Sequence, residues 1–266
     1  MNLLAARVVL RPRRLSDVLD LALPLCLANV RPLVALAAGA LGPIAALAAA
    51  LRLRGHCGWP WVWAAVLELS FLTEGLFAVA FGELLFKQPA DVRPAAVART
   101  FAGMLPAYVL AFVGRQLLLL VSAILIFVPF LQGSATLFAA DALLLERSSR
   151  RTAFERSRAL AHNRSGFCLG LWLATLALPV LGALVADQLG NAVVGFVFQL
   201  GKPTGDLLTQ GGSGFAVAGA LLAAPVAAAA RFLGYIDLRT RKEGWDIQLR
   251  FLALAASAPA DGRRVA

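Results

Sequence analysis

The sequence has few of the residues from which soluble enzymes build active sites. Its 266 residues include two histidines and three cysteines; only 15% are charged, while 60% are hydrophobic. An average soluble domain is about 25% charged and about 45 to 50% apolar, so this composition excludes a water-soluble globular enzyme. Cys26, Cys57 and Cys168 are odd in number and lack CxxC spacing, which predicts neither a disulfide framework nor a redox site.

The chain also lacks the short motifs that mark common catalytic and cofactor sites. The GxSxG, HExxH, P-loop and GxGxxG patterns are absent from the sequence. His56 and His162 fall on opposite sides of the predicted membrane spans, so they are not expected to form an acid–base pair or to bind one metal ion. We therefore predict that the protein is not an enzyme and holds no cofactor or metal.

What the sequence has is long apolar runs, several of which approach or exceed the length of about 18 residues that crosses a bilayer as a helix. The run from Met104 to Leu145 is too long for one crossing. It is expected to fold back near Pro129 and Gly133, because proline removes a helical donor. We predict an all-α polytopic membrane protein with six transmembrane helices, at about 30–51, 61–86, 105–128, 130–145, 167–185 and 214–233. The stretch 189–200 is too short to cross and is expected to be interfacial or re-entrant.

The basic residues predict the orientation of these spans. The net charge is +10, and 21 of the 25 basic residues fall in segments on one side if the first span begins inside. The outer side receives Arg52, Arg54 and Lys202, and Arg115 lies within the membrane. Because Lys and Arg in short loops stay cytoplasmic, both termini are expected in the cytoplasm. An arginine-rich, alanine-rich composition is typical of a GC-rich bacterium, which places the protein in the inner membrane and requires no nucleic-acid partner.

Three amphipathic helices are predicted on the cytoplasmic surface, at 16–29, 89–103 and 152–163, each before a pair of spans. Arg158 in the third helix and Arg150 and Arg151 directly before this helix are candidate contacts for lipid headgroups. The alternative is that these helices are only connectors.

Residues 1–250 are expected to form one transmembrane helical domain, with 251–266 as a disordered cytoplasmic tail. Small residues are expected to mediate helix packing, among them Gly39, Ala46, Gly114, Gly182 and Gly219.

Charged residues inside the spans are candidate functional groups, because burying a charge in the bilayer is costly. Glu74 in the second span and Arg115 in the third lie at a similar depth, roughly 15 to 18 Å at 1.5 Å per residue, and are predicted to pair. The pair would either fix helix packing or serve a proton or anion pathway. Glu68 has no predicted partner, whereas Glu83 and Asp141 are expected to reach the inner interface.

The segment after the sixth span is rich in charges of both signs. Two interpretations remain open for it: a stop-transfer flank with an aromatic anchor, or a strip that docks a partner or the protein's own inner helices. The candidate strip consists of Tyr235, Asp237, Arg239, Arg241, Lys242, Glu243, Trp245 and Asp246.

This segment also carries a resemblance to a known family. The pattern Tyr-x-Asp-x-Arg-x-Arg-Lys-Glu-Gly-x-Asp at 235–246, with the segments 15–20, 141–146 and 153–160, is similar to bacterial multi-pass proteins related to the membrane domain of glycerophosphodiester phosphodiesterases. The resemblance implies an inner-membrane accessory role beside other membrane proteins and a cytoplasmic ATPase. It does not imply phosphodiesterase activity, because that chemistry belongs to a separate barrel domain of about 250 residues.

These observations lead to a first expectation about function. The charged strip and the shortage of catalytic groups favour a non-enzymatic scaffold or subunit of a membrane complex, with the lipid bilayer and other membrane proteins as partners. The alternative is a transporter or lipid-binding protein that uses the bundle interior around Glu74 and Arg115, since broken helices near Pro43 and Pro129 often line cavities. An intramembrane enzyme is a third alternative.

Overall fold

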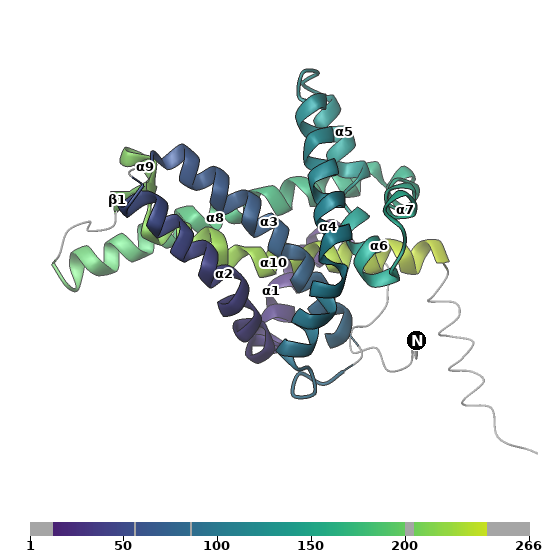
Figure 1. Ribbon diagram of the computed structural model, residues 1–266, viewed down its shortest axis with the longest axis horizontal. Coiled ribbons are helices and arrows are strands. Elements are labelled where there is room, and N and C mark those ends of the chain that lie inside the picture. The colour runs from purple at the N-terminus through teal and green to yellow at the C-terminus, as the bar shows by residue number, and fades with distance from the viewer. Residues whose placement is uncertain (1–12, 56, 86, 200–204, 244–266) are drawn as a thin grey trace, which may run out of the picture.

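A computed structural model describes residues 13–55, 57–85, 87–199 and 205–243 of the chain, and Figure 1 shows that helices make up nearly all of this part. The elements in chain order are α1 (Leu15–Ala28), α2 (Val30–Leu53), α3 (Trp59–Leu84), α4 (Pro94–Ser122), α5 (Val128–Ala135), α6 (Ala139–Glu146), α7 (Arg150–His162), α8 (Ser165–Phe196), β1 (Gly205–Asp206), α9 (Leu207–Gln210), β2 (Gly212–Ser213) and α10 (Gly214–Glu243). The tail predicted at 251–266 lies outside the described residues.

The predicted all-α membrane fold is confirmed. Six helical stretches are long and apolar enough to cross a membrane: Val30–Leu53, Trp59–Leu84, Pro94–Ser122, Val128–Glu146, Ser165–Phe196 and Gly214–Lys242. A helix satisfies its backbone hydrogen bonds internally, which is the requirement for crossing hydrocarbon. Each expected span therefore corresponds to an observed helical stretch, although several boundaries differ.

The break in the long apolar run comes earlier than predicted. The turn occupies residues 123–127, and Pro129 lies in the first turn of α5. Proline starts a helix well because its missing N–H would have no partner in that first turn anyway. The fourth span is itself divided, since α5 ends at Ala135 and α6 begins at Ala139.

Two predicted surface segments belong instead to long helices. The region 89–103 does not form a separate amphipathic helix, because α4 begins at Pro94 and continues without interruption through Pro106 to Ser122. The stretch 189–200, expected to be interfacial or re-entrant, continues α8 as far as Phe196. Pro106 does not end α4, and α8 contains no further proline after Pro179, so in both cases the helix continues.

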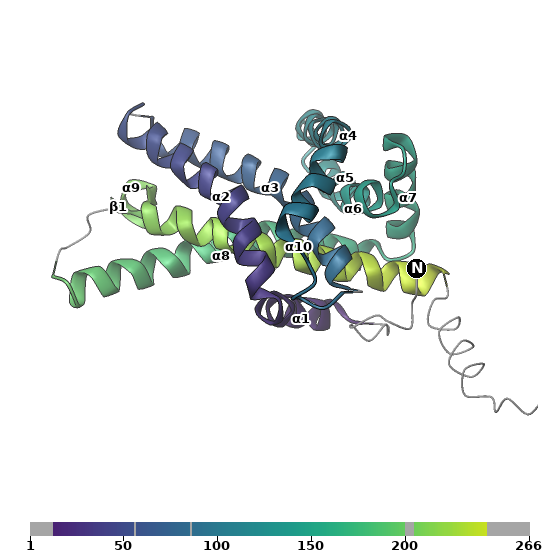
Figure 2. The same ribbon diagram turned by 60° about the horizontal axis from the view of Figure 1, so that its bottom comes forward.

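The other two predicted surface helices are present as α1 and α7. Helix α1 lies beside α10, below it in the view of Figure 2. Helix α7 is amphipathic: Ala153, Ser157 and Leu160 are buried on one face, while Arg151 and Arg158 are exposed on the other.

The closest helix pair is α8 and α10, which run side by side along the long axis in Figure 1. A Cβ added to Gly219 would lie 2.1 Å from the carbonyl oxygen of Gly182, and one added to Gly182 would lie 2.6 Å from that of Gly219. The prediction of small-residue packing is thus confirmed at these two glycines. It is not met at Gly39 and Gly114, which have nothing within 4 Å of an added Cβ, or at Ala46, which is exposed.

Helices α4 and α5 stand upright in Figure 1, across the direction of α8 and α10, so the helices do not form a simple parallel bundle. Where α4 meets α3, the Tyr108 ring lies against Gly75, whose added Cβ would be only 2.5 Å from the ring. A glycine at this point allows the aromatic side chain to enter between the helices. The crossing brings α3, α4, α6, α8 and α10 together around one interior region.

Candidate functional site

The interior region contains a buried cluster of three charged side chains. Arg231 of α10 forms an ion pair with Glu74 of α3 through Nη1, and its Nε lies 3.0 Å from Oδ2 of Asp141 in α6. Their side chains are at most 7% exposed. One guanidinium thus connects two carboxylates from two other helices, and the cluster joins α3, α6 and α10.

The predicted pairing of Glu74 with Arg115 is corrected by this geometry. Glu74 makes its ion pair with Arg231, not with Arg115. Arg115 lies on α4 within electrostatic range of Glu74, Asp141 and Arg231. In the part of the chain that the structure describes, its buried Nε has no hydrogen-bond partner. Both residues line the same cavity, but the sequence did not identify the partner of Glu74.

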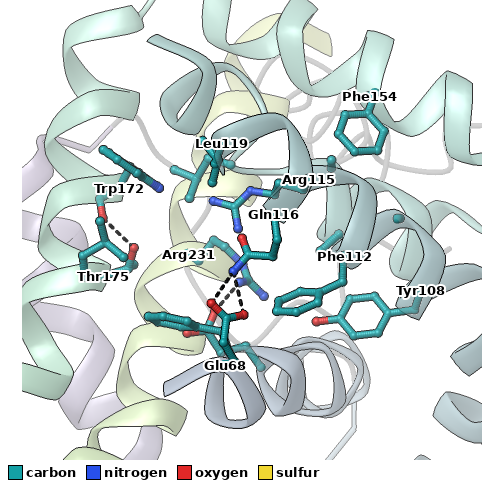
Figure 3. Close-up of a pocket in the computed structure, with 17 residues that line it drawn as sticks. Glu68, Tyr108, Phe112, Arg115, Gln116, Leu119, Phe154, Trp172, Thr175 and Arg231 are labelled. Atoms are coloured by element: carbon teal, nitrogen blue, oxygen red, sulfur yellow. Dashed lines mark hydrogen bonds and ion pairs between the residues drawn. The ribbon is translucent and has the colours of Figure 1, made fainter. Parts of the chain in front are cut away.

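A cavity of about 260 Å³ lies beside the cluster, and both Arg115 and Arg231 line it. Figure 3 shows the Arg115 and Gln116 side chains reaching from α4 toward Arg231 and Glu68. Aromatic rings from several helices form much of the remaining wall, namely Phe71, Tyr108, Phe112, Phe154 and Trp172. The cavity therefore combines guanidinium groups with an apolar, aromatic enclosure.

Glu68, which had no predicted partner, is paired across the edge of this cavity. Nε2 of Gln116 donates to both carboxylate oxygens of Glu68, at 3.0 and 2.7 Å. This contact joins α3 to α4 at an exposed position (Figure 3). The Glu68 carboxylate therefore has a neutral hydrogen-bond donor rather than a cation as its partner.

Sequence reasoning missed Arg231 and misplaced Asp141. Arg231 was counted among the cytoplasmic basic residues because the apolar run ends at about 233, yet α10 continues to Glu243. Asp141 was expected at the inner interface, but it is fully buried. A usable signal was present in the sequence, since Arg231 follows a long run of small apolar residues and lies twelve positions before the helix ends.

Most described residues of the candidate docking strip make contacts within the chain. The Tyr235 hydroxyl donates to Glu146, and Arg239 Nη1 lies 3.5 Å from Oε1 of the same carboxylate. Lys242 Nζ donates to the carbonyl of Ala159 at 3.0 Å. These interactions connect α10 to α6 and α7.

Asp237, which is 2% exposed, holds the start of the described chain. Its Oδ1 accepts from the backbone N–H of Arg13 at 2.7 Å, and its Oδ2 accepts from Arg241 Nε at 2.9 Å. Arg241 also donates to the carbonyl of Arg13 at 2.8 Å. Glu243 is the last residue of α10, and Trp245 and Asp246 lie outside the described residues. The described strip thus pairs mainly with the protein's own inner elements.

The candidate headgroup contacts lie on the exposed face of α7. Arg150, Arg151 and Arg158 are all exposed, and Arg151 forms an i,i+4 ion pair with Glu155 at 2.9 Å. Interaction of these arginines with lipid stays a prediction.

Comparison of the chain with protein-family models, with curated proteins and with solved structures finds no match. The resemblance to the membrane domain of glycerophosphodiester phosphodiesterases therefore stays a prediction from the sequence.

Proposed function

We propose that this integral membrane protein binds a small amphiphilic anion in the cavity beside Arg115, in a non-enzymatic lipid-binding or transport role. The observation that carries the proposal is a missing hydrogen-bond partner at the side chain of Arg115 in the described chain. Arg115 lines the cavity, and its buried Nε lacks a hydrogen-bond partner among the described residues. Buried donors without partners are costly, so a ligand oxygen at this position would stabilise the site.

An anionic ligand fits Arg115 better than it fits Arg231. Arg231 already contacts two carboxylates, those of Glu74 and Asp141, whereas no carboxylate of the described chain forms an ion pair with Arg115. Arginine presents a planar set of donors that matches carboxylate and phosphate groups. The ligand would therefore offer one of these two groups.

The walls of the cavity support an amphiphile. Phe112, Phe154 and Trp172 provide aromatic surface around the arginine, which suits an apolar body attached to the anionic group. The volume of about 260 Å³ is close to the lower end of the range of about 300 to 1,000 Å³ for small-molecule pockets. It suits a headgroup or a short amphiphile rather than a whole phospholipid.

We place the protein in a bacterial inner membrane with both ends in the cytoplasm. The contact of Arg13 with Asp237 brings the start of the described chain to the end of α10, as expected for an even number of spans. Many basic residues gather at this end of the molecule, including the exposed arginines of α7, and the positive-inside rule then assigns it to the cytoplasm.

A scaffold or complex-subunit role with other membrane proteins and a cytoplasmic ATPase is less favoured. That expectation depended on the charged strip being available to a partner. Tyr235, Asp237, Arg239 and Arg241 instead contact Glu146 and Arg13 of the same chain. The proposal therefore rests on the cavity and not on the strip.

The experiment compares Arg115→Gln with Arg99→Gln, which removes the same charge from an exposed position on the same helix. Octyl phosphate is titrated into the purified protein by calorimetry, and retention of phosphatidylglycerol from nanodiscs is measured by native mass spectrometry. A lost charged hydrogen bond corresponds to about 1.5 to 3 kcal/mol. We therefore expect a 10- to 100-fold weaker affinity for Arg115→Gln and no change for Arg99→Gln.

The two measurements distinguish the source of the anion. An effect on octyl phosphate alone indicates a free amphiphile, and an effect on phosphatidylglycerol indicates a lipid headgroup. Equal binding by the wild type, Arg115→Gln and Arg99→Gln in both measurements would contradict the proposal.

A further inference from the structure

A second and larger cavity lies at the other end of the molecule from Arg13 and Asp237. Its volume is about 710 Å³, and it is lined by residues of α2, α3 and α10 together with the β1–α9 segment. The ends of α2 and α3 lie beside α9 and β1 at the left of Figure 1. Much of the wall consists of small apolar side chains, including Ala45, Ala48, Ala49 and Ala218. This cavity, which we call the alanine groove, is separate from the Arg115 cavity.

Two polar groups lie at the end of the alanine groove. The guanidinium of Arg52 is stacked over the Trp59 ring, with 5.3 Å between its carbon and the ring centroid. The indole Nε1 of Trp59 is buried and has no hydrogen-bond partner among the described residues. Both residues line the groove, so a cation and a free N–H donor occupy the same site.

The position of Trp59 is fixed by the segment before α10. A Cβ added to Gly212 would lie 2.3 Å from the Trp59 ring, and Nε1 of Trp63 donates to the carbonyl of Gly211 at 2.8 Å. The Trp59 indole therefore packs directly on this backbone, which restricts its orientation.

Asp187 of α8 holds the same segment in place. Its side chain is fully buried, accepts from Leu207 N at 3.1 Å and from Asn191 Nδ2 at 3.0 Å, and also accepts from the Ser213 hydroxyl. Asp206 caps α9 by accepting from the backbone N–H groups of Leu208 and Thr209. The groove thus has an ordered polar end rather than a flexible loop.

We propose that the alanine groove binds an anionic phospholipid. The phosphate would accept hydrogen bonds from Arg52 and from Nε1 of Trp59, and an acyl chain would lie along the alanine surface. No carboxylate of the described chain forms an ion pair with Arg52, so its charge is complementary to a phosphate. This proposal does not rest on the function proposed for the Arg115 cavity.

The location of the groove favours a lipid over a soluble anion. Arg52 and Trp59 lie at the ends of two membrane-spanning helices, where arginine and tryptophan meet the headgroup region of a bilayer. Ala45 and Ala49 are exposed on α2, so the apolar wall is accessible from the hydrocarbon. A ligand at this site would have its anionic group at headgroup depth and its apolar part in the membrane.

The experiment uses the full chain in nanodiscs with equal amounts of phosphatidylglycerol and phosphatidylcholine. Native mass spectrometry counts the lipids that remain bound after the nanodisc is removed. Arg52→Gln is compared with Arg54→Gln, a neighbouring exposed arginine that does not line the groove. We expect Arg52→Gln to lose at least fivefold in retained phosphatidylglycerol, and Arg54→Gln to match the wild type.

Two further variants test the two parts of the site. Trp59→Phe keeps an aromatic ring beneath Arg52 but removes the N–H donor, so a smaller loss of phosphatidylglycerol is expected. Ala49→Phe fills the apolar wall at an exposed position and should lower the retention of phosphatidylglycerol as well. Arg99→Gln, which removes an exposed arginine of α4 that does not line the groove, should leave this retained lipid unchanged.

The result that overturns the proposal is equal phosphatidylglycerol retention by Arg52→Gln and Arg54→Gln. Equal retention of phosphatidylcholine and phosphatidylglycerol by the wild type would also overturn it, because the anionic group would then have no role.

Discussion

At the scale of single residues, the cluster of Arg231, Glu74 and Asp141 shows how ion pairing offsets the cost of burying charged side chains. The side chains are almost completely buried, so each ion loses its hydration and depends on its partners. A buried ion pair adds little net stability, but removal of one partner leaves the others uncompensated. The cluster is therefore sensitive to loss of the central cation, which contacts both carboxylates.

We predict that Arg231→Gln lowers the stability of the protein by about 3 to 5 kcal/mol, because it leaves two buried carboxylates without their cation. Thermal unfolding of the purified protein in detergent measures this effect. Arg158→Gln removes an exposed arginine on α7 and should leave the midpoint unchanged. Equal midpoints for the two variants would show that the cluster does not stabilise the fold.

At the scale of helices, the contact between α8 and α10 depends on two glycines. Gly182 and Gly219 bring the two backbones so close that an added Cβ on either would overlap the carbonyl oxygen of the other. Close approach of this kind increases van der Waals contact, which is a main source of helix association in a bilayer. Gly39 on α2 provides a natural comparison, since it has open space around it.

We predict that Gly219→Val destabilises the protein by at least about 1 to 3 kcal/mol, the usual cost of overpacking. The equivalent change Gly39→Val should be close to neutral, because its side chain meets no neighbour. The measurement is thermal unfolding in detergent, with the yield of monodisperse protein as a second readout. A Gly39→Val variant as unstable as Gly219→Val would mean that helix propensity, and not the α8–α10 contact, determines the effect.

At the scale of the whole molecule, the two ends of the fold differ in their chemistry. The end near Arg13 and Asp237 gathers the ion pairs of the C-terminal strip and the exposed arginines of α7. The opposite end holds Cys57, Trp59 and the short α9 segment. The proposed orientation assigns the first end to the cytoplasm and the second to the outer side.

The native cysteines test this orientation. Burial raises the pKa of the Cys26 thiol to about 12, so below that pH it stays protonated and reacts slowly. Cys168 is fully buried, whereas Cys57 is only half-buried at the outer end. We predict that a membrane-impermeant maleimide applied to intact spheroplasts at pH 7.5 labels Cys57.

The controls for this labelling are two variants. Cys57→Ser should remove the signal, and His162→Cys in that background should react only after the membrane is permeabilised, because His162 is exposed at the end of α7. Labelling of His162→Cys in intact spheroplasts would reverse the proposed orientation.

Much of the fold follows directly from the sequence. The apolar runs predicted six spans because the length and apolar composition of a membrane-spanning helix are properties of one continuous segment. The boundaries were less predictable from hydropathy, since α8 continues past residue 185 and α4 begins at Pro94 and continues through Pro106. The amphipathic pattern of 152–163 predicted α7 for the same local reason, as its buried and exposed faces alternate at helical spacing.

The contacts of the candidate site were only partly predictable from local sequence. The sequence by itself determined that the chain is helical and that Glu74 and Arg115 fall in segments long and apolar enough to cross a membrane, and it predicted that the basic residues gather on one side. Only the tertiary structure decided that Glu74 pairs with Arg231, that Asp141 is buried and that the strip at 235–242 contacts Glu146 and Arg13. The physical reason is that hydropathy and helical periodicity are properties of short segments, whereas the burial of a side chain and the partner of a charge depend on how distant helices cross and rotate.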